Sequence, residues 1–121
     1  MKKLLITLLL ISPFSFADWG DVYYCQMTNF SAVSLEGKAK NYTLDKFQFK
    51  LDKTKKAMVF GSSGFFNTTE AKLTPHSYWP TVGVWYAYGT YDMYYFDRGK
   101  FLYVSTGSSG SSSVSADCDK F

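Results

Sequence analysis

The fold class can be read from one stretch, residues 46–52, with the sequence Lys46-Phe47-Gln48-Phe49-Lys50-Leu51-Asp52. Apolar and polar side chains alternate, so Phe47, Phe49 and Leu51 fall on one face of an extended chain. A helix would scatter these three side chains around its axis. The stretch therefore predicts a strand with one face buried and the other in solvent.

Short β-prone runs recur on both sides of this stretch, and none of the chain after residue 17 has a convincing helical period. Polar or glycine-containing turns are predicted at residues 52–56 and at Asp97-Arg98-Gly99-Lys100, each between two such runs. The predicted strands cover residues 22–28, 32–35, 40–45, 46–52, 57–60, 70–74, 81–90, 91–96, 101–106 and 114–118.

The first residues have the pattern of a secretory signal peptide. Two lysines precede a short apolar run, and Ser15-Phe16-Ala17 places small residues at the −3 and −1 positions of a cleavage site. A membrane anchor is the alternative, but crossing a bilayer needs about 20 apolar residues, and Pro13 interrupts this run. We predict a signal peptide over residues 1–17, a single β domain over residues 18–121, and a periplasmic or secreted protein with no stable membrane anchor.

The two cysteines bear on the order of the strands. An even number of cysteines in an exported protein favours a disulfide, here between Cys25 and Cys118. Short connections predict an antiparallel meander, and this bond would place its first and last strands side by side. We therefore predict an all-β fold, a small antiparallel meander closed into a roughly eight-stranded barrel, with a two-sheet β-sandwich as the alternative.

The charge of the chain argues against nucleic acid as a partner. The whole sequence carries a formal charge of +3, but removal of residues 1–17 leaves 104 residues with 11 basic and 10 acidic side chains. Nucleic-acid binding requires clustered lysines and arginines, and Arg98 is the only arginine. We expect no nucleic acid partner.

A serine- and glycine-rich segment, residues 105–113, separates the last two predicted strands. Such a composition is typical of flexible linkers. Because the segment lies between a strong strand and Cys118, we expect a long surface loop. A strand of small residues packed under bulky aromatic side chains is the alternative.

The sequence offers little for catalysis. His76 is the only histidine, no zinc-site spacing exists, and neither a nucleophile elbow nor a phosphate loop is present. A small hydrolase would need a pair of carboxylates, for which Glu70 and Asp92 are the candidates. We expect no cofactor, no metal and no enzymatic activity.

Aromatic residues make up 22 of the 104 residues that follow residue 17, and they are concentrated between residues 78 and 103. This number exceeds what one side of a small sheet can hide, so alternation must send some of them outward. Exposed aromatic side chains contact sugars or proteins. The predicted contact residues are His76, Tyr78 and Trp79, in or beside a proline-bounded loop, and Trp85, which we expect to face outward.

Two resemblances accompany this interpretation. The segments Tyr24-Cys25-Gln26-Met27, Lys46-Phe47-Gln48-Phe49 and Val59-Phe60-Gly61-Ser62 resemble small exported proteins of unknown function from marine bacteria and their phages. That resemblance implies no functional residues. In size, export and terminal cysteines the chain is also similar to the periplasmic C-type lysozyme inhibitors, small barrels whose inhibitory serine- and glycine-rich loop is faintly echoed by residues 61–66.

We therefore expect an exported, monomeric, non-catalytic binding or inhibitory module with an unknown protein or glycan target, contacted through exposed aromatic side chains and loops. A lipocalin-like carrier of a small apolar ligand and a lysozyme-inhibitor-like protein are the alternatives.

Overall fold

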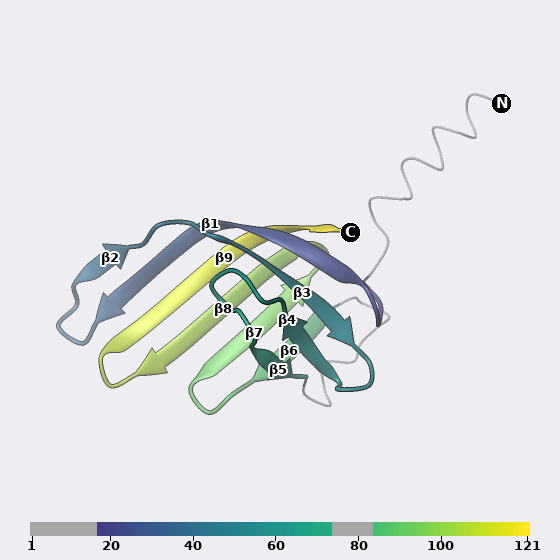
Figure 1. The fold of residues 1–121 in the computed structure, drawn as a ribbon. Helices are drawn as coiled ribbons and strands as arrows, with labels where there is room; N and C mark the ends of the chain where they lie inside the picture. Colours follow the sequence, from purple (N-terminus) through teal and green to yellow (C-terminus); the bar gives the residue numbers. More distant parts are fainter. Residues whose placement is uncertain (1–16, 74–83) are drawn as a thin grey trace, which may run out of the picture.

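A computed structural model of the chain describes residues 17–73 and 84–121. Residues 1–16 of the predicted signal peptide lie outside the described residues. The two described ranges contain nine strands and no helix (Figure 1). The strands are β1 (Val22–Ser34), β2 (Ala39–Asn41), β3 (Lys46–Asp52), β4 (Ala57–Phe60), β5 (Glu70–Lys72), β6 (Val84–Tyr88), β7 (Asp92–Asp97), β8 (Lys100–Gly107) and β9 (Gly110–Lys120).

All the strands belong to one antiparallel sheet with the order β5-β4-β3-β1-β9-β8-β7-β6, and β2 pairs separately with β1. The two ends of this order approach each other at an isolated bridge between Leu73 and Ala87. The result is a nearly closed eight-stranded meander barrel, which confirms the predicted fold and not the alternative sandwich.

The first and last strands are joined by the predicted disulfide. Cys25 of β1 lies directly opposite Cys118 of β9, and their Cα atoms are 4.0 Å apart. Both side chains point into the barrel, with 3% and 9% of their surfaces exposed. The bond therefore holds together the two strands whose pairing closes the meander.

Aromatic side chains fill the interior of the barrel. Phe47, Phe49 and Leu51 of the stretch that predicted the fold are all buried, as their alternation requires. Phe49 packs edge-to-face on Phe96 across the barrel, with ring centroids 5.1 Å apart. The other buried aromatic side chains are Tyr23, Phe60, Phe66, Trp85, Tyr94 and Phe101.

Burial affects the acidity of two interior tyrosines. Tyr23 stacks on Phe49, and its burial, together with the nearby charge of Asp21, raises its pKa to about 12. Burial and the charge of Asp92 also raise the pKa of Tyr94 well above its usual value. Both phenols therefore stay neutral to a higher pH than an exposed tyrosine does.

The prediction of a long loop over residues 105–113 is wrong. β8 continues to Gly107 and β9 begins at Gly110, so the turn between them has only two residues. Small residues allow close strand packing: Gly110 has a φ of +133°, and a Cβ there would collide with the carbonyl oxygen of Val33 in β1. The segment forms the ends of two paired strands of small residues, so the alternative is right that it is strand, but none of these residues is buried under aromatic side chains.

Strand β1 is longer than the two short strands predicted for its residues. A bulge between Met27 and Asn29 inserts one extra residue opposite β9. This shift keeps Met27 and Phe30 on the same inner side of the sheet. Beyond the bulge, β1, β8 and β9 extend past the short strands β3 to β5, with β2 beside the end of β1 (Figure 1). This extension forms one end of the barrel.

Candidate functional site

Three of the four predicted contact residues, His76, Tyr78 and Trp79, lie outside the described residues. The fourth, Trp85, is buried, with 3% of its surface exposed, and it packs edge-to-face on Trp19 at 4.9 Å between ring centroids. The expectation that Trp85 faces outward is wrong.

The register of β6 explains the orientation of Trp85. Trp85 lies opposite Phe96, and both side chains point into the barrel. The other face of β6 carries Tyr86 and Tyr88, whose hydroxyl groups can stay in water. The indole of Trp85 is mostly hydrocarbon and has no hydroxyl group, so it is the aromatic side chain of β6 that is buried. Its Nε1 finds no acceptor among the described residues.

The extended end of the barrel contains an open groove with a volume of about 730 Å3. We call it the end groove. The inner faces of β1, β8 and β9 form its floor, and β2 with the loop after β4 forms its walls. The side chains that determine its chemistry are those of Phe30, Lys38, Lys40, Tyr42, Phe65, Ser105 and Ser112.

Three aromatic rings line one side of the end groove. The ring of Phe30 lies 4.8 Å from that of Tyr42 and 4.8 Å from that of Phe65, measured between centroids. Phe30 also packs against the core. Tyr42 and Phe65 are 41% and 44% exposed. Phe30 thus anchors two solvent-exposed rings to the rigid interior.

The floor of the end groove presents hydroxyl groups. Ser105 of β8 lies opposite Ser112 of β9, and their Oγ atoms are 2.7 Å apart, within hydrogen-bond distance. Gly107 and Gly110 continue the same face without side chains. Each hydroxyl can donate one hydrogen bond and accept two, so the floor offers free hydrogen-bonding capacity to a ligand.

Charged side chains border the end groove on the β2 side. Lys38 and Lys40 line it, as does Glu36 in the turn between β1 and β2. The Nζ atom of Lys40 lies over the ring of Tyr42, 4.9 Å from its centroid, in a cation–π contact. All ten acidic residues lie within the described ranges, and none of them forms an ion pair with Lys38 or Lys40.

A second aromatic surface lies on the outside of the barrel. It consists of exposed and partly buried side chains from three neighbouring strands, and we call it the outer strip. Tyr86 lies opposite Tyr95, with ring centroids 5.1 Å apart, and Tyr95 lies opposite Leu102. The outer strip comprises Tyr86, Tyr88, Met93, Tyr95, Leu102 and Val104.

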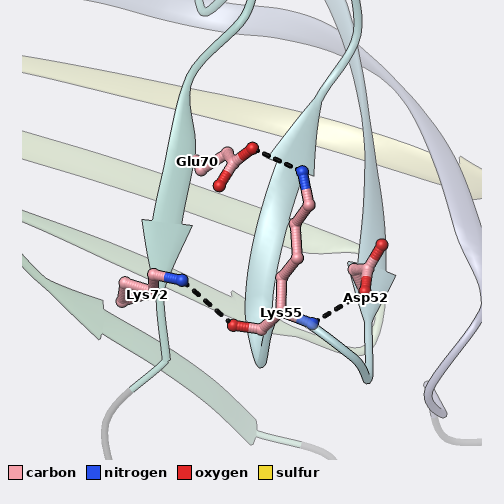
Figure 2. Close-up of polar contacts among 4 residues, drawn as sticks. All are labelled: Asp52, Lys55, Glu70 and Lys72. Atoms are coloured by element: carbon pink, nitrogen blue, oxygen red, sulfur yellow. Dashed lines mark hydrogen bonds and ion pairs between the residues drawn. The ribbon is translucent and has the colours of Figure 1, made fainter.

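The carboxylates proposed for a hydrolase are engaged elsewhere. Glu70 Oε2 accepts a hydrogen bond from Lys55 Nζ at 2.7 Å, and the backbone carbonyl of Lys55 accepts one from Lys72 (Figure 2). The ammonium of Lys55 lowers the pKa of Glu70. A general acid requires a raised pKa, so the lowered pKa of Glu70 supports no acid role for it. The exposed ion pair instead ties β5 to the β3–β4 turn. Asp92 accepts a hydrogen bond from the Tyr103 hydroxyl at 3.4 Å.

The residues of the end groove come from segments that are far apart in the sequence. Phe30 follows the predicted strand 22–28, Tyr42 lies within 40–45, and Phe65 follows 57–60. Nothing in their local sequence marks them as neighbours. The one local signal is the turn-like segment Gly61-Ser62-Ser63-Gly64, which precedes Phe65 and Phe66. After it, Phe65 is exposed and Phe66 is buried in the core. Pairing between β1 and β2 brings the other two rings together.

Within residues 17–73 and 84–121, no three potential metal-ligating side chains cluster together. These two ranges also contain no helix of the length and hydropathy needed to span a membrane. Comparison of the chain with protein-family models, with curated proteins and with solved structures finds no match.

Proposed function

We propose that the protein is a non-catalytic binding module that holds a saccharide in the end groove. One observation carries this proposal. A concave site of about 730 Å3 places exposed aromatic rings beside a hydroxyl-bearing floor. Small-molecule sites commonly have volumes of about 300–1,000 Å3, so the end groove has the size of a ligand site.

The chemistry of the end groove matches that of a sugar ring. The C–H groups on one face of a pyranose are attracted to the negative face of an aromatic ring, such as that of Tyr42 or Phe65. The sugar hydroxyls then need partners that both donate and accept, which Ser105 and Ser112 can supply. An apolar ligand would leave these serine hydroxyls without new partners.

The structure supports the alternatives less well. Aromatic side chains fill the barrel interior, which leaves little room for the ligand of a lipocalin-like carrier. A protein target would be contacted through a surface enriched in aromatic side chains, for which the outer strip is the candidate. A lysozyme-inhibitor-like contact through residues 61–66 would rely on Phe65, because Phe66 is buried.

Location outside the cytoplasm accords with this role. Disulfides persist in oxidising compartments, and the bond between Cys25 and Cys118 connects the two strands that close the barrel. We place the protein in the periplasm or in the extracellular medium, where it would meet glycans of the cell surface.

An oligosaccharide microarray tests the proposal, with the Tyr42→Ala variant beside the wild type. Tyr88→Ala is the matched control, since Tyr88 is also a strongly exposed tyrosine (56%) but lies on the outer strip. We expect the wild type and Tyr88→Ala to capture the same saccharides. Capture by Tyr42→Ala should be weaker by roughly two- to tenfold, the range of one aromatic contact. Failure to capture any saccharide, or equal loss in both variants, would overturn the proposal.

A further inference from the structure

We infer that the end groove selects anionic saccharides, and that Lys38 and Lys40 bind the carboxylate or sulfate group of the sugar. This inference rests on the proposed function. The aromatic rings and the serines do not distinguish a neutral from a charged sugar. The charges that border the groove do, and they indicate the class of saccharide.

The pairing of β2 with β1, together with one backbone hydrogen bond of Lys38 just before β2, places both lysines along the end groove. Lys40 lies opposite Ala32, a residue of the inner face of β1. Ser34, two residues after Ala32, donates a backbone hydrogen bond to the carbonyl oxygen of Lys38. Residues i and i+2 of a strand share a face and lie about 7 Å apart. The two ammonium groups can therefore reach the same ligand.

The cation–π contact of Lys40 provides a mechanism for selectivity. Its ammonium lies over the ring of Tyr42, the ring on which a sugar would stack. A neutral sugar must displace this ammonium and gains no charged partner in return. An anionic sugar offers the ammonium a carboxylate or sulfate in place of the ring, which frees the face of Tyr42 for stacking.

The balance of nearby charge favours an anion. Two lysines and one acidic side chain, Glu36, line the groove, which leaves one positive charge in excess. Other exposed lysines, such as Lys53 in the β3–β4 turn, also form no ion pair within the part of the chain that the structure describes, so an unpaired lysine alone indicates little. Lys38 and Lys40 differ because they border a concave site with stacking and hydrogen-bonding groups.

The test uses a microarray that carries uronic acid oligosaccharides, their neutral methyl esters, and sulfated and unsulfated forms of a second series. We expect the wild type to capture each uronic acid better than its methyl ester, or each sulfated sugar better than its unsulfated form. Comparison of the two series shows whether a carboxylate or a sulfate is preferred. Lys38→Met and Lys40→Met should each reduce this preference about two- to fivefold, as expected for an exposed ion pair. Glu36→Gln should increase it. The preference should also disappear near 1 M salt, where the Debye length falls to about 3 Å.

Lys53→Met is the matched control, because it removes the same charge from the β3–β4 turn, whose residues do not line the end groove. A loss of preference in Lys53→Met equal to that in Lys40→Met would indicate non-specific attraction and overturn the inference. Equal capture of charged and neutral saccharides, still sensitive to Tyr42→Ala, would also overturn it but leave the proposed function standing. Capture of no saccharide at all would overturn both.

Discussion

Loss of the bond between Cys25 and Cys118 should destabilise the barrel strongly. The two cysteines are separated by 93 residues in the sequence. In the chain-entropy model, breaking the cross-link of a loop of this length raises the entropy of the unfolded chain. The free energy of unfolding falls by about 4.6 kcal/mol at 25 °C. For a domain of about 100 residues, such a loss corresponds to a decrease in Tm of roughly 20–35 °C.

Urea unfolding followed by tryptophan fluorescence can measure this loss. Three samples separate its causes: the oxidised protein, the reduced protein, and a Cys25→Ala/Cys118→Ala variant. Reduction removes the cross-link but leaves both sulfur atoms in the core, whereas the variant also leaves a small cavity at two buried positions. We expect the variant to lose about 1 kcal/mol per deleted sulfur beyond the loss in the reduced protein.

One result would refute this reasoning. If the reduced protein unfolds within about 1 kcal/mol of the oxidised protein, the bond contributes far less than the entropy of a loop of this length. The register of β1 and β9 alone would then hold the barrel closed. Free thiols in the protein isolated from its native compartment would contradict the account more directly.

Three further predictions concern the fold. Phe96→Ala should destabilise the protein by about 3–5 kcal/mol in urea unfolding, because Phe96 is fully buried, and a loss below 1 kcal/mol would show that the core is not packed as described. Gly110→Ala should cost about 1–3 kcal/mol, because its φ is +133° and the new Cβ would meet β1; an unchanged Tm would contradict this. Between pH 10 and pH 12 an unfolded chain loses the Tyr23 proton while the folded protein keeps it, so stability should fall as the pH rises through this window. Tyr23→Phe should show a smaller fall in its urea midpoint, and an equal fall would exclude this role for the tyrosine.

The strands were predictable wherever one face of the sheet meets a core and the other meets water. Residues 46–52 show this best, since their alternation is reproduced residue by residue in the burial of β3. The serine-rich segment was not predictable by the same rule. Ser105 and Ser112 face an open groove and not a core, so this part of the sheet needs no apolar period.

The orientation of β6 shows a second limit of sequence patterns. Alternation separates Trp85 and Ala87 from Tyr86 and Tyr88, but both faces of the strand are apolar or aromatic. The pattern therefore could not say which face points inward. The deciding factor is tertiary, because the register with β7 places Trp85 opposite the fully buried Phe96.

The end groove depends on contacts that no local pattern contains. The bulge after Met27 sets the side of the sheet on which Phe30 lies, and the pairing of β1 with β2 then brings Tyr42 beside it. The sequence predicts exposed aromatic side chains, but the density of aromatic residues points to the segment between residues 78 and 103. Tyr42 and Phe65 lie in earlier segments, where aromatic residues are less dense.

The central claim, that the end groove is the ligand site, is tested most directly by NMR titration of the labelled protein with a saccharide captured on the array. The account predicts that the largest amide shift changes map to Lys40, Tyr42, Phe65 and the serines of the groove floor. It also predicts that these changes saturate at a single stoichiometry. Changes centred on Tyr86 and the rest of the outer strip, or no saturable change at any residue, would contradict it.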